Sequence, residues 1–377
     1  MSAYMKSLIL AMSEGWKSDV TPLMRRISQV ATGAGSLFLL VAGSRLALAL
    51  PADRKAARIV ADLYQPQRCK GRLFLGIAKW MITFGIPGFR PTYLGTVGSI
   101  PEVTWLKEAA ERGCIGFLGC NPNHGPRCVL AGIEPSSGEK FIAKLGLDES
   151  AHAIRREAKV LENLKGCYPG VITPMELKTP SLQSQVASEQ TFDWALLRLP
   201  YLGNSAPKSM DDAEVHKLLG EWLGGDSKPL SEFPWAAQLL ERVAADEAPT
   251  GWHDAMKCRR IRTTLLHGDF AVWNLRKTLD GLMAIDWEWG VENAVAGIDL
   301  AHGLRQEFYM ARGMKPEAAV ANILKLAASS RWSGYLNMCG WSNDLEDWLR
   351  LGLLHSHFNA LNPSAELLKV LDIHLNS

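Results

Sequence analysis

Apolar positions repeat at strand spacing in the middle of the chain and at helix spacing toward its end. Three short apolar runs at 114–120, 127–133 and 140–145 predict strands, separated by a loop at 121–126 and a turn at 136–139. After Gly203 the spacing becomes that of amphipathic helices. Two further strands are predicted before them, at 171–177 and 191–199. The predicted helices cover residues 211–223, 231–244, 316–328, 343–355 and 363–375. Strands followed by helices indicate an α+β fold.

One helix is expected inside the strand region, over residues 151–165. Glu157 falls on its apolar stripe, three residues after Ile154 and four before Leu161. A carboxylate on an apolar stripe is costly to bury unless it has a partner of opposite charge. Lys144, in the strand just before this helix, is the partner that we expect.

The stretch from 265 to 290 concentrates polar side chains behind two apolar runs. The runs at 265–266 and 282–285 predict short buried strands, and Asp280-Gly281 marks the hairpin turn that we expect between them. Polar groups follow each run: His267, Asp269 and Asn274 after the first, Asp286 after the second. Phosphoryl transfer needs a carboxylate to orient the attacking hydroxyl and hard oxygen ligands for Mg²⁺, so this set fits that chemistry.

The spacing Asp-x4-Asn is common by itself, and an isolated Asp-Gly turn indicates only a hairpin. The two together, in the order strand, loop and strand, are far more specific. The loop H-G-D-x-x-x-x-N followed by I-D-W-E resembles the aminoglycoside phosphotransferase and choline kinase-like family, relatives of the protein kinases.

The resemblance implies a two-lobed, protein-kinase-like fold, with a small antiparallel-sheet N-lobe and a mainly helical C-lobe. It implies that Asp269 is the catalytic base and that Asn274 and Asp286 hold Mg²⁺. His267 is then a packing and hydrogen-bonding residue, and Asp299 braces the catalytic loop through hydrogen bonds.

The same resemblance assigns the nucleotide contacts. Lys144, paired with Glu157, reaches the phosphates of ATP, the co-substrate. Gly119, just before the loop that covers these phosphates, and Gly125, within it, are the glycines assigned there, although G-x-G-x-x-G is absent. Backbone groups of the hinge at 195–201 read the base, so the sequence does not indicate a preference between ATP and GTP.

The acceptor is expected to be a hydroxyl of a small molecule, such as a sugar or sugar-like metabolite. An aminoglycoside-type antibiotic kinase is an alternative, but residues 300–377 hold seven acidic and seven basic residues and show no field for a polycation. Trp332, Trp341 and Trp348 either pack in the core, which we prefer, or stack on the acceptor.

A nucleotide-binding pseudokinase or scaffold with the same fold is the rival from another class. Its expected mark is the loss of a residue needed for catalysis. The four residues in question are all present: Lys144, Asp269, Asn274 and Asp286.

The charge balance divides the 377 residues unevenly. Residues 1–100 hold 13 Lys and Arg against 4 Asp and Glu, and the remainder holds 28 against 35. We therefore expect a basic N-terminal extension (1–100) of unknown role, an N-lobe (101–200) and a C-lobe (201–377). The basic, amphipathic stretch at 68–86 is interpreted as a helix packed on the main domain; contact with an anionic membrane surface is the alternative.

The remaining sequence features indicate a cytoplasmic protein, peripheral at the membrane if the extension binds there. Seven cysteines without C-x-x-C spacing indicate neither a disulfide framework nor a zinc site. We expect no signal peptide, and the apolar stretches at 36–50 and 73–88 are too short and too interrupted to span a bilayer. No nucleic-acid-binding module is apparent, and the sequence does not indicate an oligomeric state.

Overall fold

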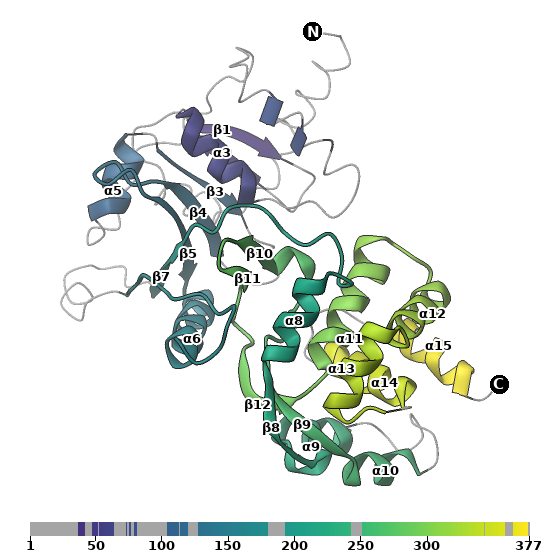
Figure 1. The fold of residues 1–377 in the computed structure, drawn as a ribbon. Helices are drawn as coiled ribbons and strands as arrows, with labels where there is room; N and C mark the ends of the chain where they lie inside the picture. The colour runs from purple at the N-terminus through teal and green to yellow at the C-terminus, as the bar shows by residue number, and fades with distance from the viewer. Residues whose placement is uncertain are drawn as a thin grey trace. The chain divides into compact units, whose positions relative to one another are not determined.

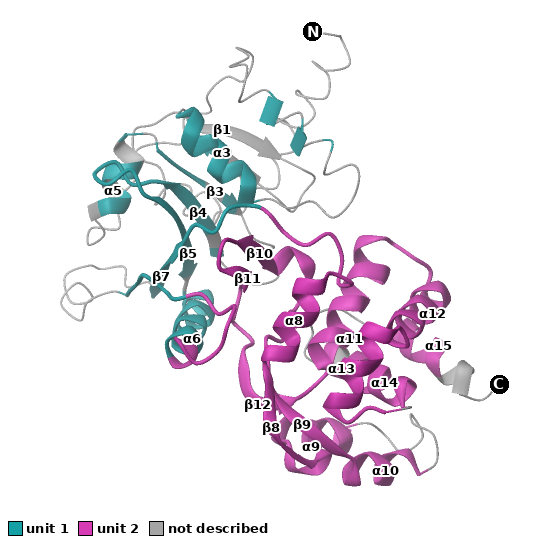
Figure 2. Ribbon diagram, viewed as in Figure 1, with its two compact units in different colours: residues 1–162, 173–204 teal, residues 163–172, 205–377 magenta. Residues whose placement is uncertain are grey.

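The computed structural model of the chain (Figure 1) contains two compact units, which are coloured separately in Figure 2. Unit 1 comprises residues 1–162 and 173–204, and unit 2 comprises residues 163–172 and 205–377. The residues that the structure describes are 37–41, 47–51, 53–63, 73, 75–76, 79–80, 104–112, 114–119, 127–179, 193–242, 251–342, 344–358 and 365–375.

Unit 1 is built on a seven-stranded antiparallel sheet in the order β1-β2-β3-β4-β5-β7-β6. Its strands are β1 (Leu37–Val41), β2 (Ala47–Pro51), β3 (Ile115–Gly119), β4 (Arg127–Ile133), β5 (Lys140–Leu147), β6 (Glu176–Lys178) and β7 (Trp194–Pro200). β4 and β5 form a hairpin in which Arg127 pairs with Gly146 and Ile133 with Lys140. The strands predicted at 114–120, 127–133 and 140–145 are therefore confirmed, whereas only the end of the one predicted at 171–177 is in this sheet.

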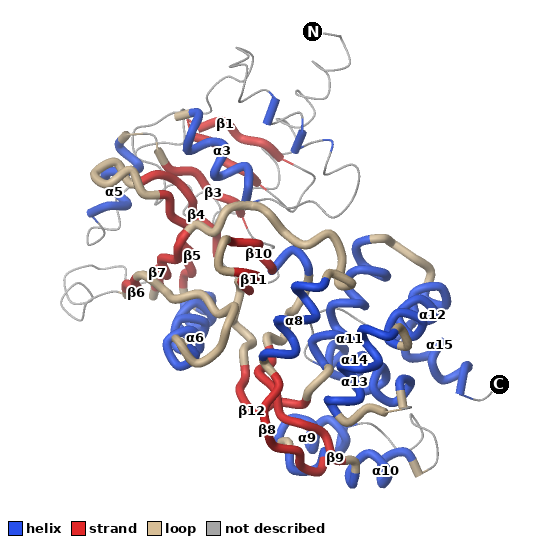
Figure 3. Tube along the Cα trace, viewed as in Figure 1, coloured by secondary structure: helices blue, strands red, loops and turns tan. Residues whose placement is uncertain are grey.

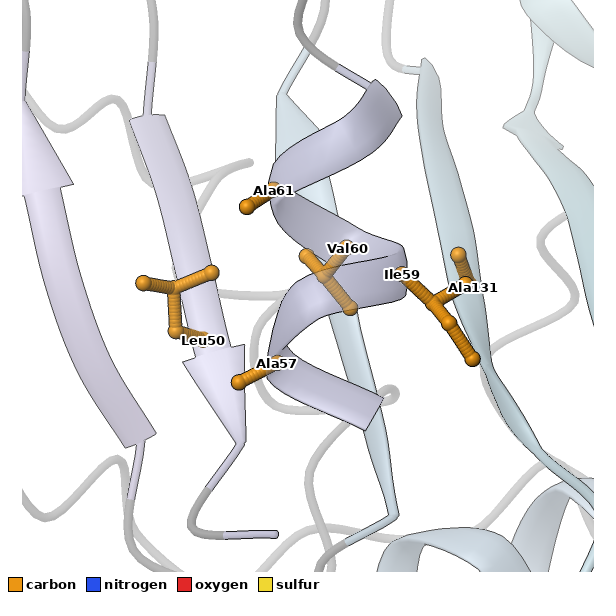
Figure 4. Close-up of a cluster of buried hydrophobic side chains, with 6 residues drawn as sticks. All are labelled: Leu50, Ala57, Ile59, Val60, Ala61 and Ala131. Carbon is orange, nitrogen blue, oxygen red and sulfur yellow. The ribbon is translucent and has the colours of Figure 1, made fainter. Parts of the chain in front are cut away.

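The first hundred residues contribute to this same sheet. β1 and β2 add to its edge at β3, and helix α3 (Arg54–Leu63) packs on β2, β3 and β4. Figure 4 shows the apolar side chains between them: Leu50 of β2, Ala131 of β4 and Ala57, Ile59, Val60 and Ala61 of α3. The predicted boundary at residue 100 therefore falls inside unit 1; the chain passes from one unit to the other after Glu162, Ile172 and Asn204.

The basic stretch at 68–86 lies mostly outside the described residues. Of its four basic residues, only Lys79 is described, and its ammonium is 2.7 Å from the Asp62 carboxylate of α3. Among the described residues, no helix has the length and apolar character that a bilayer span requires.

Two more helices belong to unit 1 by sequence position and contact. α5 (Thr104–Glu111) precedes β3, and α6 (Glu149–Leu164) follows β5. Gly146, at the end of β5, lets α6 approach closely, because a Cβ there would lie 2.5 Å from the Ser150 carbonyl oxygen. This close approach sets the distance between β5 and the first turns of the helix.

Unit 2 is mainly helical, as predicted (Figure 3). Its helices are α8 (Ala213–Glu221), α9 (Pro234–Arg242), α10 (Trp252–Cys258), α11 (Ile298–Arg305), α12 (Pro316–Ala327), α13 (Ser330–Cys339), α14 (Leu345–Phe358) and α15 (Ala365–Leu375), with a π-helix at Gln306–Ala311. Pro316 at the first position of α12 and the left-handed Gly340 after α13 are typical helix boundaries.

Two small sheets complete unit 2. β8 (Leu223–Pro229), β9 (Arg260–Leu266) and β12 (Val291–Val295) form one, in the order β12-β9-β8. β10 (Leu275–Thr278) and β11 (Gly281–Ala284) form the other. The hairpin that we predicted between 265–266 and 282–285 is wrong: Asp280-Gly281 joins β11 to β10, and β9 pairs elsewhere. The sequence pattern shows β10 poorly because its four residues, LRKT, include two charged ones.

The three tryptophans at the C-terminal end of unit 2 are part of its core. Trp332, Trp341 and Trp348 are fully buried. The indole N–H of Trp341 donates to the Ala296 carbonyl at 2.9 Å, and that of Trp348 donates to the Gly297 carbonyl at 2.9 Å. Trp341 and Trp348 brace the start of α11, and the burial of all three rings excludes stacking on an acceptor.

Candidate active site

Lys144 and Glu157 form the ion pair that the apolar stripe predicted. Lys144 lies in β5, where it is paired with Val129 of β4 and Leu197 of β7. Its ammonium lies 2.7 Å from both carboxylate oxygens of Glu157 on α6. The two side chains are 14% and 2% exposed, so the pair is largely removed from water.

The residues of the H-G-D-x-x-x-x-N loop follow β9, which is buried from Thr263 to its end. Gly268 has a φ of 85°, and a Cβ there would lie 2.6 Å from the Trp289 Cβ, so only glycine fits without displacement. The Asp299 carboxylate, on α11, accepts the backbone N–H of His267 at 2.7 Å and that of Gly268 at 3.0 Å. Asp299 thus fixes the backbone at the start of the loop.

The surroundings of Asp299 are unfavourable for its charge. Burial raises its pKa to about 7, and the negative charge of Asp269 acts in the same direction. The two backbone hydrogen bonds favour the ionised form and oppose that rise. The brace is therefore a carboxyl group whose protonation changes near neutral pH.

His267 has the packing and hydrogen-bonding environment that the resemblance implied. Its ring is fully buried and lies 4.7 Å from the Trp287 ring. Its Nε2 is 2.8 Å from the Ile285 carbonyl, and its Nδ1 accepts the backbone N–H of Asp269 at 3.3 Å. These partners require a neutral ring with the proton on Nε2, and burial accordingly lowers the pKa of His267.

Asp269 and Asn274 are in direct contact. Asn274 ends a single 3-10 turn (Val272–Asn274), and its amide nitrogen donates to the Asp269 carbonyl at 2.9 Å and to Asp269 Oδ2 at 3.0 Å. A carbonyl oxygen only accepts, so the amide nitrogen must face Asp269. The amide oxygen of Asn274 therefore points away from Asp269, where it is able to act as a metal ligand.

Ile285, the residue before Asp286, is hydrogen-bonded through both its N–H and its carbonyl group. The Ile285 N–H donates to the Asn274 carbonyl at 2.8 Å, and the Ile285 carbonyl pairs with His267 Nε2. Asp286 itself has a φ of 71°, in the left-handed region that aspartate tolerates better than most residues. Such backbone conformations cost about 1–3 kcal/mol and cluster at functional sites. The loop and the end of β11 are thus connected through Asn274, Ile285 and His267.

Sequence reasoning missed one side chain that contacts Asp269. His302, on α11, places Nε2 2.9 Å from Asp269 Oδ1 and is 1% exposed, whereas Asp269 is 25% exposed. His302 lies three residues after Asp299, and residues at this spacing lie on the same face of a helix. That spacing was the available signal: a helix that braces the loop through Asp299 carries a histidine one turn later.

Of the two glycines assigned to the phosphate loop, the structure describes only one. Gly119 is the last residue of β3, whereas Gly125 lies outside the described residues. Their role stays a prediction.

The side-chain oxygens of Asn274 and Asp286 suit Mg²⁺ bound together with phosphates. Among the described residues no group of three or more His, Cys, Asp and Glu side chains is arranged to hold a metal ion. Mg²⁺ usually takes one or two protein carboxylates plus substrate phosphates and water, and prefers oxygen ligands. An amide oxygen from Asn274 and a carboxylate from Asp286 fit this pattern.

No model of a known protein family matches the chain, and no curated protein does. Similar solved structures are small-molecule kinases. A Plasmodium vivax ethanolamine kinase is 12% identical, over 87% of this chain and 94% of that one, with a TM-score of 0.39. An aminoglycoside phosphotransferase from Streptomyces rimosus is 14% identical over 66% and 90% of the two chains (TM-score 0.36). An amicoumacin kinase in complex with AMP-PNP and Ca²⁺ is 15% identical over 65% and 84% (TM-score 0.34). Identities this low do not reveal a substrate, so function must come from this chain's own residues.

Proposed function

We propose that this protein transfers the γ-phosphoryl group of ATP to a hydroxyl of a small molecule. The observation that carries the proposal is the environment of Asp269. One of its oxygens is held by Asn274 and the other by His302, while the side chain keeps 25% of its surface exposed. A carboxylate offers about four lone-pair sites, so the two that remain are available to an incoming hydroxyl.

The reaction assigned to these residues is direct transfer. The acceptor oxygen forms the new bond to the γ-phosphorus, the bond from that phosphorus to the bridging oxygen breaks, and ADP leaves with the electron pair. Asp269 orients the hydroxyl and takes its proton. Mg²⁺, when bound, neutralises charge on the phosphates.

The other residues have supporting roles in this proposal. Asn274 would contribute its amide oxygen and Asp286 its carboxylate to Mg²⁺. Lys144, oriented by Glu157, contacts the nucleotide phosphates; Gly119 precedes the covering loop and Gly125 belongs to it. GTP remains an alternative to ATP as the phosphoryl donor.

The acceptor class is a neutral or weakly charged, hydroxyl-bearing metabolite, such as a sugar. Two features of unit 2 support this choice over a polycationic antibiotic. The C-terminal helices carry balanced charge. The charge of the acidic run at the start of α14 is also partly offset: Asp344 and Asp347 both pair with Arg259, at 2.5 and 3.3 Å.

The test is a paired measurement on the wild type and Asp269→Asn. A screen of hydroxyl-bearing metabolites for acceptor-dependent ADP release identifies the best acceptor. General-base catalysis is worth about 10²–10⁴-fold, so kcat should fall by that factor in Asp269→Asn. Nucleotide affinity by calorimetry should hardly change, since this carboxylate faces the acceptor hydroxyl in our assignment.

The matched control is Asp254→Asn, which neutralises an exposed aspartate on α10. It should turn over like the wild type. Equal kcat in wild type and Asp269→Asn would refute the assignment of the base. Nucleotide binding without acceptor-dependent ADP release from any acceptor would favour a nucleotide-binding scaffold instead.

A further inference from the structure

Helix α11 is buried along its whole length and yet carries a row of polar side chains. All eight of its residues are buried. Asp299 and His302 belong to it, and Gln306 follows in the first position of the π-helix. Buried polar side chains are costly unless they are hydrogen-bonded, so their partners show what they do.

The partners lie in the catalytic loop. Asp299 holds the loop backbone at His267 and Gly268, and His302, one turn later, holds the side chain of Asp269. The helix backbone is close as well, because a Cβ on Gly303 would lie 2.9 Å from the Phe270 carbonyl oxygen. α11 therefore fixes the loop at its backbone and at the proposed base.

His302 is itself held on its far side by α14. Its Nδ1 lies 3.1 Å from Ser356 Oγ, and Ser356 Oγ lies 3.1 Å from the Gly352 carbonyl. Gly352 also lets the two helices approach, since a Cβ there would lie 2.4 Å from the Ala301 Cβ. The ring is thus held between α14 and Asp269.

The hydrogen-bond partners of His302 show whether its Nε2 carries a proton. The Ser356 hydroxyl has one proton, which goes either to Nδ1 or to the Gly352 carbonyl. In the first case the neutral imidazole has its proton on Nε2; in the second Nδ1 carries a proton, with or without a second proton on Nε2. An ionised carboxylate oxygen only accepts, so the 2.9 Å contact with Asp269 Oδ1 requires a proton on Nε2, and Nε2–H donates to that oxygen. The amide nitrogen of Gln306 lies 3.1 Å from the same nitrogen; with Nε2 protonated, this amide is turned so that its oxygen faces Nε2.

The π-helix is an independent sign that this region is specialised. π-helical turns are rare and occur often at functional sites. Here the turn starts at Gln306, directly after α11, and Gln306 is the residue that reaches back to His302.

From these contacts we infer that His302 is a positioning residue for phosphoryl transfer. Its Nε2–H holds Oδ1 of Asp269, so that the carboxylate presents one orientation to the acceptor hydroxyl. This role rests on the proposed function, because it requires Asp269 to act on an acceptor. His302 acts through Asp269 and touches neither substrate.

Two substitutions separate the donated hydrogen bond from the bulk of the ring. The side-chain nitrogen of glutamine in His302→Gln reaches the place of Nε2 and keeps the donor to Asp269. Asparagine in His302→Asn reaches only the place of Nδ1 and loses it. Misplacing a catalytic group by about 1 Å costs on the order of 10²-fold, so kcat should fall about that much in His302→Asn. In His302→Gln it should stay within about tenfold of wild type.

The KM values for nucleotide and acceptor should change little in both variants, since the base acts in the transition state. His216→Asn is the control: His216 packs edge-on against Trp332 in unit 2, and no contact with Asp269 is recorded for it among the described residues. Wild-type kcat in His302→Asn, or equal losses in the Gln and Asn variants, would overturn the positioning role while leaving the proposed function intact. Absence of turnover in the wild type would overturn both.

A second measurement tests the inference even if the His302 variants fail to fold. Long-range ¹H–¹⁵N correlation spectra of the wild type should show His302 Nε2 protonated, with a resonance that shifts in Asp269→Asn. An unprotonated Nε2 would overturn the inference without any activity measurement.

Discussion

Removing Lys144 tests whether its pair with Glu157 is a buried interaction or only a surface contact. In Lys144→Met the carboxylate of Glu157, 2% exposed and 2.7 Å from the lysine nitrogen, loses its counter-charge. Breaking a buried pair from one side typically costs about 3–5 kcal/mol. An exposed pair is worth about 0–1 kcal/mol. Because Glu157 is buried, we expect Lys144→Met to lose about 3–5 kcal/mol of stability.

A double-mutant cycle isolates the charge term. Glu157→Gln should cost about 1–2 kcal/mol, because an amide is cheaper to bury than a charge and its oxygen still accepts from Lys144. The double variant Lys144→Met/Glu157→Gln should be more stable than Lys144→Met alone, since it holds no buried carboxylate. The non-additivity should reach about 2 kcal/mol.

The assay is urea unfolding followed by circular dichroism, with Lys217→Met as the exposed control. Lys217 and Glu221 form an i,i+4 pair at 3.7 Å whose side chains are 75% and 40% exposed, so this change should hardly alter stability. Additive effects, or a loss in Lys144→Met as small as that in the control, would refute the argument from burial.

Two further predictions concern the loop. Because burial raises the pKa of Asp299 to about 7 from its ordinary 3.8, the folded state keeps a proton that the unfolded state releases between these values. The free energy of unfolding should therefore fall as pH rises through this window, by about 4 kcal/mol in total. The difference between wild type and Asp299→Asn in urea unfolding at pH 5 and pH 8 measures the upper part of this window, about 3 kcal/mol of the total, and an unchanged difference would contradict it. Second, ATP should raise the melting temperature more with Mg²⁺ than without, because in our assignment the metal links the phosphates to Asn274 and Asp286. A nucleotide concentration about 100-fold above Kd stabilises the folded state by about 2.7 kcal/mol. Asp286→Ala should lose the Mg²⁺-dependent part, and equal shifts in both proteins would remove Asp286 from the metal site.

The sequence pattern predicted those features that depend on near neighbours in the chain. The alternation in β4 and β5, the apolar stripe of α6 and the H-G-D-x-x-x-x-N spacing each reflect local geometry. The Lys144–Glu157 pair was predictable for the same reason: a carboxylate on an apolar stripe needs a cation, and the preceding strand carries one.

Other features depended on which strand pairs with which, and the pattern carries that information weakly. β10 is four residues long with two charges, so the Asp-Gly turn was assigned to the wrong strand pair. β1, β2 and α3 join the main sheet through contacts across more than sixty positions of the chain, such as Leu48 with Leu118. Nothing in the basic composition of the first hundred residues shows this.

The fine geometry around Asp269 was decided by tertiary structure alone. The loop sequence identifies the aspartate, but its neighbours His302 and Ser356 lie 33 and 87 positions further along the chain. They meet it only because α11 packs against the loop at Gly303 and against α14 at Gly352. A hydrogen bond between residues so distant depends on the packing of whole helices. The sequence alone therefore indicated the residues to which we assign the chemistry, and helix packing determined how the proposed base is held.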